Sequence, residues 1–324
     1  MIRIRFPTAV RPPAELQDRP DDSVEITHDT AVIALESEKN RPEHVDGVNT
    51  VLRPIFEQMW HHASPLFRIV SVETRSSCNY TCSFCPVSRS VDPREAGEMS
   101  LELLQRIAGE LADLRFAGRI ALFGNNEPLL DRRLADIVRM FRSSCPKADL
   151  RILTNGVLAT PDLVGELFEA GLSTLTVNNY TDGRRLIAPV WTLIAAADRL
   201  RPFDIRISVR SRTETLTTRA GLAPNKPHPT RTPQGFCALP FTDLHISYTG
   251  DVNLCCFDAY GSVSMGKVTD ASIVDIWQAP GFAVHRRSLL RGSRAGLSLC
   301  QHCDFDGFRE PATNVGRKVT RADL

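Results

Sequence analysis

The sequence predicts an α/β fold, a (β/α) barrel or part of one, followed by a small cysteine-rich second domain. Two patterns indicate the barrel: short β-branched apolar runs recur, and amphipathic helical patterns separate them. This alternation favours parallel strands joined by right-handed crossovers. A hairpin pattern and a final Cys-x-x-Cys pair indicate the second domain. The 324 residues are long enough for one large domain plus an appendage.

Residues 1–67 are rich in proline and charge at first and contain no recognisable motif, so we expect an N-terminal extension. The barrel is predicted over 68–215. Its strands are expected at 69–73, 119–124, 150–155, 174–179 and 205–210. Between them, Leu134, Ile137, Val138 and Phe141 have the i, i+3, i+4, i+7 spacing of a helix face. In such barrels the chemistry lies at the carboxyl ends of the strands.

The remaining segments are a linker loop over 216–236, the second domain over 237–310 and a tail over 311–324. Within the second domain, period-2 alternation on both sides of Thr249-Gly250-Asp251 predicts a β-hairpin over 243–256.

Composition narrows the possible partners. The formal net charge is +1, which gives no reason to expect nucleic acid. The sequence has no apolar run of the ~18 residues that a membrane span needs. The N-terminus lacks the long apolar segment of a signal peptide. We therefore expect a cytoplasmic protein without membrane or nucleic-acid partners.

The nine cysteines are the most informative residues. In a reducing compartment, clustered cysteines more often bind metal than form disulfides. Cys78-x3-Cys82-x2-Cys85 directly follows the first barrel strand. Three thiolates on one loop can hold three corners of a cubane iron–sulfur cluster and leave its fourth iron open. Structural zinc is the alternative, but it takes four protein ligands, and no fourth Cys or His follows closely.

The loop CNYTCSFC, with the aromatic Phe84 before its last cysteine, resembles the signature of the radical S-adenosylmethionine (SAM) superfamily. Further motifs follow at the ends of the later strands. Gly124-Asn125-Asn126-Glu127-Pro128 stands where the family has a Gly-rich Glu-Pro motif that binds the SAM amino group, here with Asn for the middle glycine. The other expected SAM contacts are Asn155 in a Thr-Asn-Gly segment, Asn178, Asn179 and Arg210.

This resemblance spans roughly residues 68–310 and implies a partial (β/α)6 TIM-like barrel. It implies that Cys78, Cys82 and Cys85 hold a [4Fe-4S] cluster whose open iron binds SAM. Reductive cleavage of SAM then gives a 5′-deoxyadenosyl radical that abstracts hydrogen from an unactivated carbon. An electron donor such as flavodoxin or ferredoxin is an expected partner.

A second cysteine set comprises Cys237, Cys255, Cys300 and Cys303. A hairpin with a Cys-x-x-Cys pair is also how zinc ribbons are built, so spacing alone leaves structural zinc open. Behind a radical SAM barrel, the pattern resembles the SPASM/twitch extensions of that superfamily. The resemblance implies a C-terminal twitch domain with one auxiliary [4Fe-4S] cluster ligated by these four thiolates.

The reaction is suggested by similarity to 2-deoxy-scyllo-inosamine dehydrogenases and neomycin-type radical epimerases, which act on hydroxyl-bearing carbons. We therefore expect a small polar substrate, such as a sugar or aminocyclitol from natural-product biosynthesis. Our first expectation is epimerisation, with Cys256 as the hydrogen-atom donor, because neighbours on a strand face opposite sides and Cys256 would point away from the cluster ligand Cys255. A purely structural Cys256 is the alternative.

Arg219 is expected to contact the hydroxylated substrate or assist its deprotonation, or else to be a surface arginine. Two other reactions remain open, alcohol dehydrogenation through the auxiliary cluster and modification of a ribosomal peptide. A non-catalytic zinc module is the alternative from a different class. Cys145, far from both sets in the sequence, is expected to be structural.

Overall fold

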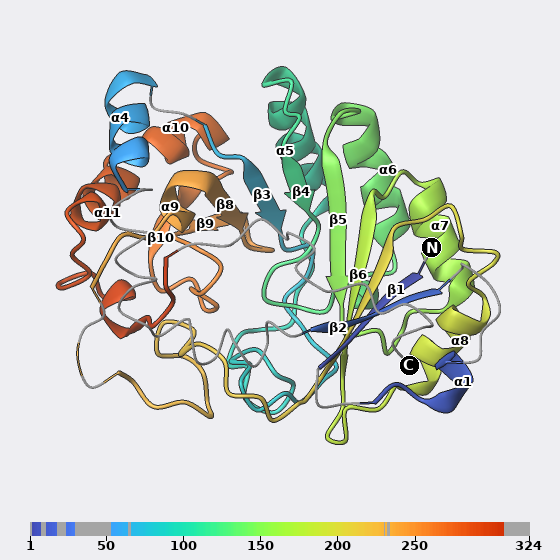
Figure 1. Cartoon of the computed structure of the whole chain (residues 1–324). Helices are drawn as coiled ribbons and strands as arrows, with labels where there is room; N and C mark the ends of the chain where they lie inside the picture. The colour runs from blue at the N-terminus through green and yellow to red at the C-terminus, as the bar shows by residue number, and fades with distance from the viewer. Residues whose placement is uncertain are drawn as a thin grey trace.

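The computed structural model describes residues 2–7, 11–17, 24–29, 53–63, 66–229, 231 and 234–307. In these residues ten strands form one sheet in the order β10-β9-β8-β3-β4-β5-β6-β7-β1-β2 (Figure 1). Its centre alternates strands and helices as predicted: β3 Ile69–Val72, α5 Leu101–Asp113, β4 Arg119–Ala121, α6 Leu134–Ser144, β5 Asp149–Thr154, α7 Pro161–Glu169, β6 Thr174–Tyr180, α8 Ala188–Ala195 and β7 Ile205–Arg210.

The five central strands are all parallel, so every one ends at the same edge of the sheet. Local signals start the helices between them. Ser100 caps α5 by accepting a hydrogen bond from Leu103 N, and Thr160 caps α7 in the same way before Pro161 at its first position. The caps define where α5 and α7 begin, and therefore where the loops that follow β3 and β5 at the site edge of the sheet end.

The two faces of the central sheet differ in burial. Along β7, Ile205, Ile207 and Val209 are buried, and the side chains between them, including Arg210, are half-buried. On β6, the side chain of Val177 lies on the same side of the sheet as Val190 of α8. Both are close to Gly156, since a Cβ built on this glycine would lie 2.6 Å from Val177 and 3.2 Å from Val190. The apolar face therefore packs under the helices, and the opposite face is polar and partly open.

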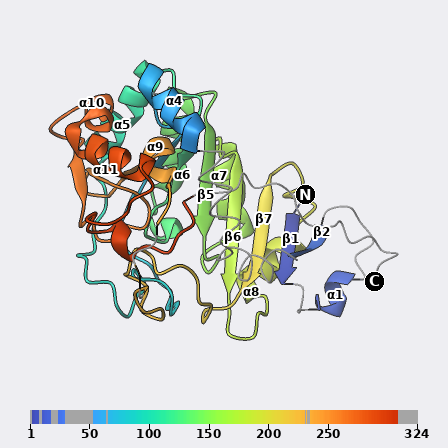
Figure 2. The ribbon, with the colours of Figure 1, turned by 60° about the vertical axis from the view of Figure 1, so that its left-hand side comes forward.

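Two described segments near the N-terminus add strands to the sheet. β1 (Ile2–Pro7) pairs in parallel with β7, and β2 (Val24–Asp29) pairs in parallel with β1, as Figure 2 shows. Helix α1 (Ala14–Gln17) lies between them in the chain. The Arg3 guanidinium donates to Asp204 at 2.6 Å, which ties β1 to the start of β7. The sheet thus continues past its fifth barrel strand.

Helix α4 (Arg53–Ala63) lies at the other end of the molecule, against the second domain. Its Phe56 ring is 5.1 Å from the Phe236 ring and 5.8 Å from the Phe241 ring. The first 67 residues therefore contribute to both ends of the structure.

The second domain consists of α9 Leu239–Thr242, β8 Asp243–Ile246, β9 Asp251–Asn253, β10 Ser264–Lys267, α10 Ile273–Gln278, α11 Pro280–Leu290 and the 3-10 turn η3 Cys300–His302. The hairpin predicted over 243–256 is present as β8 and β9, with Gly250 at φ +84 in its turn. Because β8 pairs in parallel with β3, this domain continues the barrel sheet.

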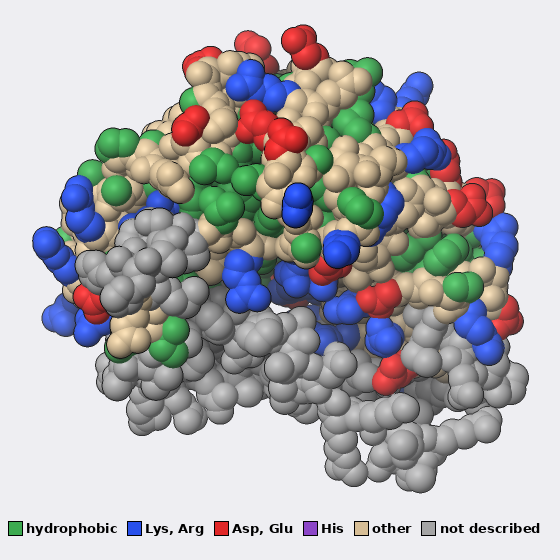
Figure 3. All heavy atoms as spheres, turned by 90° about the horizontal axis from the view of Figure 1, so that it is seen from above, with side chains coloured by type: hydrophobic (Ala, Val, Ile, Leu, Met, Phe, Trp, Pro, Cys, Tyr) green, Lys and Arg blue, Asp and Glu red, His purple; other side chains and the backbone are tan. Residues whose placement is uncertain are grey.

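Figure 3 views the molecule from above Figure 1 and shows several Lys and Arg side chains gathered near the middle of this face. Arginines in β1, β4, β5 and β7 are paired with carboxylates: Arg3 and Arg206 with Asp204, and Arg119 and Arg151 with Asp149.

No helix in the described part of the chain is long and apolar enough to cross a membrane.

Candidate active site

The first cysteine loop lies across the carboxyl ends of three barrel strands. Tyr80 donates its hydroxyl hydrogen bond to the carbonyl of Tyr180 at the end of β6. Ser83 N donates to the carbonyl of Arg212, just past β7, at 2.9 Å. Phe84, which is buried, packs its ring 5.5 Å from the Tyr180 ring. Tyr80 and Phe84 therefore fasten the loop to β6, and Ser83 fastens it to the segment just after β7.

The three thiols of this loop are partly or wholly shielded from water. Burial raises the pKa of Cys78 to about 11 and that of Cys82 to about 12, and the charge of Cys85 adds to both. The Asn155 amide lies at the end of β5, 4.0 Å from Cys78 Sγ, and donates to Asn79 at 2.7 Å. The predicted Asn155 is thus beside the cysteine loop.

Glu127 holds the ends of two strands together. Its buried carboxylate accepts from Leu129 N at 3.1 Å, Thr154 Oγ1 at 2.6 Å and Asn155 N at 2.7 Å. It also opens the short turn η2 (Pro128–Leu130). Burial raises the pKa of Glu127, and the three donors oppose that rise. In this arrangement Glu127 joins the loop after β4 to the end of β5, and Gly124 in that loop is exposed.

Asn125 links the barrel to the second domain. Its Nδ2 donates to the carbonyl of Cys256 at 3.2 Å, and its Oδ1 accepts from Arg219 Nη2 at 2.6 Å. Its backbone N donates to Glu73 Oε2 at 3.3 Å, and its carbonyl accepts from Arg94 at 2.6 Å. Asn125 therefore connects the SAM motif to the segment after β9.

Arg219 stands at the junction of the two domains. Its guanidinium lies 5.5 Å from the centre of the Phe257 ring while it donates to Asn125. Arg219 and Ala220 have φ values of +50 and +56, a left-handed conformation that side chains other than glycine rarely adopt. The turn thus holds the guanidinium between the SAM motif and the second cysteine set.

Three further predicted contacts occupy different positions. Asn179 is buried and bonds to the carbonyl of Arg185 and to Ile187 N, so it supports the loop before α8. Asn178 lies on the opposite, half-buried face of β6. Arg210 donates Nε and Nη2 to Glu214, the closer at 2.6 Å. A carboxylate of SAM would have to replace that ion pair.

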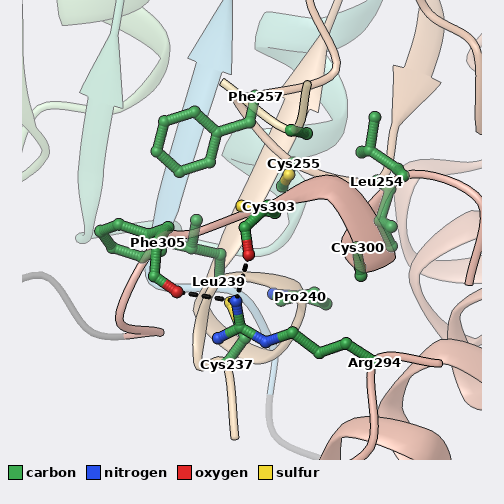
Figure 4. A pocket seen from close by; sticks show the side chains of 12 residues that line it. Cys237, Leu239, Pro240, Leu254, Cys255, Phe257, Arg294, Cys300, Cys303 and Phe305 are labelled. Atoms are coloured by element: carbon green, nitrogen blue, oxygen red, sulfur yellow. Dashed lines mark hydrogen bonds between the residues drawn. The ribbon is translucent and has the colours of Figure 1, made fainter. Parts of the chain in front are cut away.

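The second cysteine set surrounds one hollow (Figure 4). Cys237, Cys255, Cys300 and Cys303 all line it, as predicted for a shared site. Burial raises the pKa of all four thiols. The rest of the lining is mostly apolar, with one charged side chain: Ala220, Leu239, Pro240, Leu254, Phe257, Arg294, Leu299 and Phe305.

The residues present fit the implied cofactors. In a cubane each corner iron takes its own thiolate, so the sulfurs surround a space instead of meeting at one point. The hollow has this form, and within the described ranges no three His, Cys, Asp or Glu side chains converge on one metal ion. Near the SAM motif, Asn126 Nδ2 and Arg219 Nε are buried donors without a hydrogen-bond partner in the described chain. A polar ligand would satisfy them.

Cys256 differs from the expectation in one respect. Strand β9 ends at Asn253, so the alternation of strand faces does not apply to Cys255 and Cys256, which lie in the turn beyond it. The charge of Cys256 raises the pKa of both Cys255 and Cys303. Its thiol therefore lies near the auxiliary ligands, although it does not line the hollow. Cys145 ends α6 and is buried in the core, as a structural cysteine would be.

Sequence reasoning missed Glu73 and Arg94. Glu73 directly follows β3, is buried, and pairs with Arg94 at 2.7 Å. Burial raises the pKa of Glu73 to about 7, against the opposing charge of Arg94. A carboxylate at the end of a buried strand, five residues before Cys78, could have marked Glu73 as a candidate site residue. The ion pair with Arg94 could not be predicted, because it depends on the path of the long loop before α5.

The comparisons with known proteins follow this geometry. The radical SAM superfamily model matches residues 72–185, and that of an iron–sulfur cluster-binding domain, SPASM, matches residues 237–304. The S-adenosyl-L-methionine-dependent 2-deoxy-scyllo-inosamine dehydrogenase of Niallia circulans is 30% identical over 239 residues, which cover 74% of this chain and 93% of the relative. A GTP 3′,8-cyclase of Rhodopirellula baltica is 33% identical over 31% of this chain and 28% of its own.

Among solved structures, BtrN in complex with AdoMet and 2-DOIA is similar with a TM-score of 0.65 and 29% identity, covering 74% of this chain and 93% of that one. The fold class is thereby confirmed. The superfamily match implies SAM and a [4Fe-4S] cluster, and the SPASM match implies auxiliary iron–sulfur ligation. The chain therefore belongs to the radical SAM superfamily and carries a C-terminal SPASM domain.

Proposed function

We propose that the chain oxidises a hydroxyl-bearing carbon of a small aminocyclitol or sugar-like substrate to a ketone. The dehydrogenase relative, matched over 93% of its length, favours this reaction over the epimerisation that the sequence analysis placed first. The observation that carries the proposal is the position of Arg219, which joins the SAM motif through Asn125 and contacts Phe257 beside the auxiliary hollow. A substrate held there would lie between the two cofactor sites.

In the proposed ligand sets, Cys78, Cys82 and Cys85 hold the SAM-cleaving cluster, and Cys237, Cys255, Cys300 and Cys303 hold the auxiliary one. When bound, SAM with its cluster supplies the hydrogen-atom acceptor and the auxiliary cluster supplies a one-electron acceptor, so that the alcohol loses two electrons and two protons in all. A flavodoxin or ferredoxin would supply the electron that cleaves SAM.

The protein's own side chains orient the substrate and exclude water. Arg219 Nε, buried and without a partner in the described chain, would donate to the substrate hydroxyl oxygen. Asn125 keeps the guanidinium at that point, and its second bond, to the Cys256 carbonyl, keeps the SPASM domain against the barrel. Positioning of this kind is worth several kcal/mol of the barrier in enzymes generally, about 7–11 at its upper range.

Epimerisation remains the second candidate because of Cys256. A radical epimerase needs a hydrogen-atom donor, and this half-buried thiol lies directly after a proposed cluster ligand. Asn125 bonds to its carbonyl, so its backbone is fixed beside Arg219.

The test uses the anaerobically reconstituted chain with SAM, dithionite and 2-deoxy-scyllo-inosamine in deuterated water. The proposal predicts that a ketone forms, with one 5′-deoxyadenosine released for each ketone. It also predicts that the Cys256→Ser variant forms the ketone as fast as the wild type. An isomeric alcohol with deuterium at the reacting carbon, lost in Cys256→Ser, would establish epimerisation instead. A screen of other aminocyclitols and sugars accompanies the assay. Turnover only of a peptide would contradict both reactions.

A further inference from the structure

One buried cation faces the hollow that the four auxiliary cysteines share. Arg294 is 2% exposed and belongs to the lining of the hollow (Figure 4). Its guanidinium donates to the carbonyls of Cys303 at 3.0 Å and Phe305 at 2.7 Å, and to those of Gly235 at 3.2 Å and Phe236 at 3.4 Å. Each of these carbonyls lies within two residues of a proposed cluster ligand.

All four of these bonds end on neutral carbonyl groups. No carboxylate of the described residues lies within ion-pair distance of Arg294, so nothing there neutralises its charge directly. The acidic residues nearest the cysteines are otherwise engaged. Asp258, near Cys300, accepts from Ser262 N and Val263 N, and Asp304, beside Cys303, pairs with Lys226 at 2.6 Å. Arg294 is therefore a positive charge in the wall of the site that no carboxylate of the described residues pairs with.

The position of Arg294 brings its charge close to any cluster in the hollow. It lines the hollow together with the four cysteines, and its guanidinium donates to the carbonyl of the proposed ligand Cys303. Each one-electron reduction of a cluster adds one negative charge, and a buried cation beside the cluster favours the more negative state.

We propose that Arg294 sets the reduction potential of the auxiliary cluster by favouring its reduced form. This inference rests on the proposed ligand set. In the proposed dehydrogenation the cluster takes an electron from the substrate, and the arginine makes it a better acceptor. The role is electrostatic, because Arg294 is placed to touch neither substrate nor SAM.

The structure provides a matched control in the same domain. Arg286 is also buried, at 1% exposed, and also donates to carbonyls, those of Pro240 and Trp277. Its guanidinium lies over the neighbouring Trp277 and Phe282 rings, 4.1 and 4.4 Å from their centres, and does not line the hollow. Replacing Arg286 therefore removes a cation that is as buried as Arg294 but does not line the hollow.

The experiment is an EPR-monitored redox titration of the full-length chain in which Cys78, Cys82 and Cys85 are Ala, so that the auxiliary cluster alone gives a signal. Variants are Arg294→Lys, Arg294→Gln, Arg294→Met and Arg286→Met. We expect Arg294→Met and Arg294→Gln to lower the equilibrium constant for reduction at least tenfold, about 59 mV for one electron. Arg294→Lys and Arg286→Met should stay within threefold of the parent protein.

Several results would overturn the inference. One is an unchanged equilibrium constant for reduction in Arg294→Met and Arg294→Gln. Another is a fall of this constant in Arg294→Lys as large as in the neutral variants. The third is loss of the cluster from all three Arg294 variants, which would indicate that Arg294 has a purely structural role. Iron analysis of the parent, expected to give about four irons, tests the ligand set separately. The titration needs no substrate, so a failed dehydrogenase assay would leave its outcome intact.

Discussion

The contact between Arg219 and Asn125 can be tested by a double-mutant cycle. The bond is 2.6 Å long, its donor is charged, and it joins the polar turn before the second domain to the SAM motif. A hydrogen bond to a charged group contributes ~1.5–3 kcal/mol, which corresponds to about 10- to 150-fold in kcat/KM. The cycle compares Arg219→Met, Asn125→Ala and the double variant in ketone formation from the hydroxylated substrate.

If the two side chains act as one unit, the double variant should lose little more activity than the worse single variant, with a coupling energy in that range. The [4Fe-4S] cluster on the cysteine loop should be retained in all three variants, because neither side chain belongs to that loop. Arg139→Met is the control, because it removes an exposed guanidinium that pairs with Asp136 on α6. Additive losses, with coupling below ~0.5 kcal/mol, would refute the proposed unit.

Three further predictions concern the first cysteine loop and its surroundings. In the apoprotein, the rate at which Cys78 is alkylated should keep rising up to about pH 11, because burial raises the pKa of its thiol. In urea the rate, followed by mass spectrometry, should level off near the ordinary pKa of 9.0. Equal pH profiles in the two conditions would contradict the burial of this thiol. Gly124→Ala should lower stability by ~1–3 kcal/mol in urea unfolding, because its Cβ would lie 3.0 Å from Glu73 Oε2; unchanged stability would mean that Glu73 moves aside. Tyr80→Phe should cost ~1 kcal/mol and speed proteolysis of the loop through loss of the bond to Tyr180, whereas unchanged proteolysis would show that other contacts hold the loop.

Local patterns predicted the barrel and both cysteine sets. The i, i+3, i+4, i+7 spacing that predicted the helix now observed as α6 depends only on neighbours in the chain, and so do the turn at Gly250 and the Cys-x-x-Cys pair. Long-range pairing was not accessible in this way. Nothing in β8 specifies that it lies beside β3, because that depends on how the whole sheet assembles. The alternation in Ile2–Pro7 was a strand signal that the sequence analysis did not use.

The candidate site shows the same division. Motif position placed Asn155 beside the cysteine loop, but it could not reveal that Glu127 holds two strand ends together or that Arg210 pairs with Glu214. The partners of Glu127 come from the end of another strand, β5. Glu214 is only four residues after Arg210, but their contact depends on the turn that the chain makes after β7. Asn125 is the instructive case. Its place in the SAM motif was visible in the sequence, and its contact with the second domain was not.

The central claim is that the chain holds two cubanes, each on its own set of thiolates. The most direct measurement is iron and acid-labile sulfide per chain after anaerobic reconstitution, in the wild type and in the variant with Cys78, Cys82 and Cys85 replaced by Ala. We predict about eight irons in the wild type and about four in the variant. About four irons in the wild type, or tightly bound zinc in place of iron, would contradict the account.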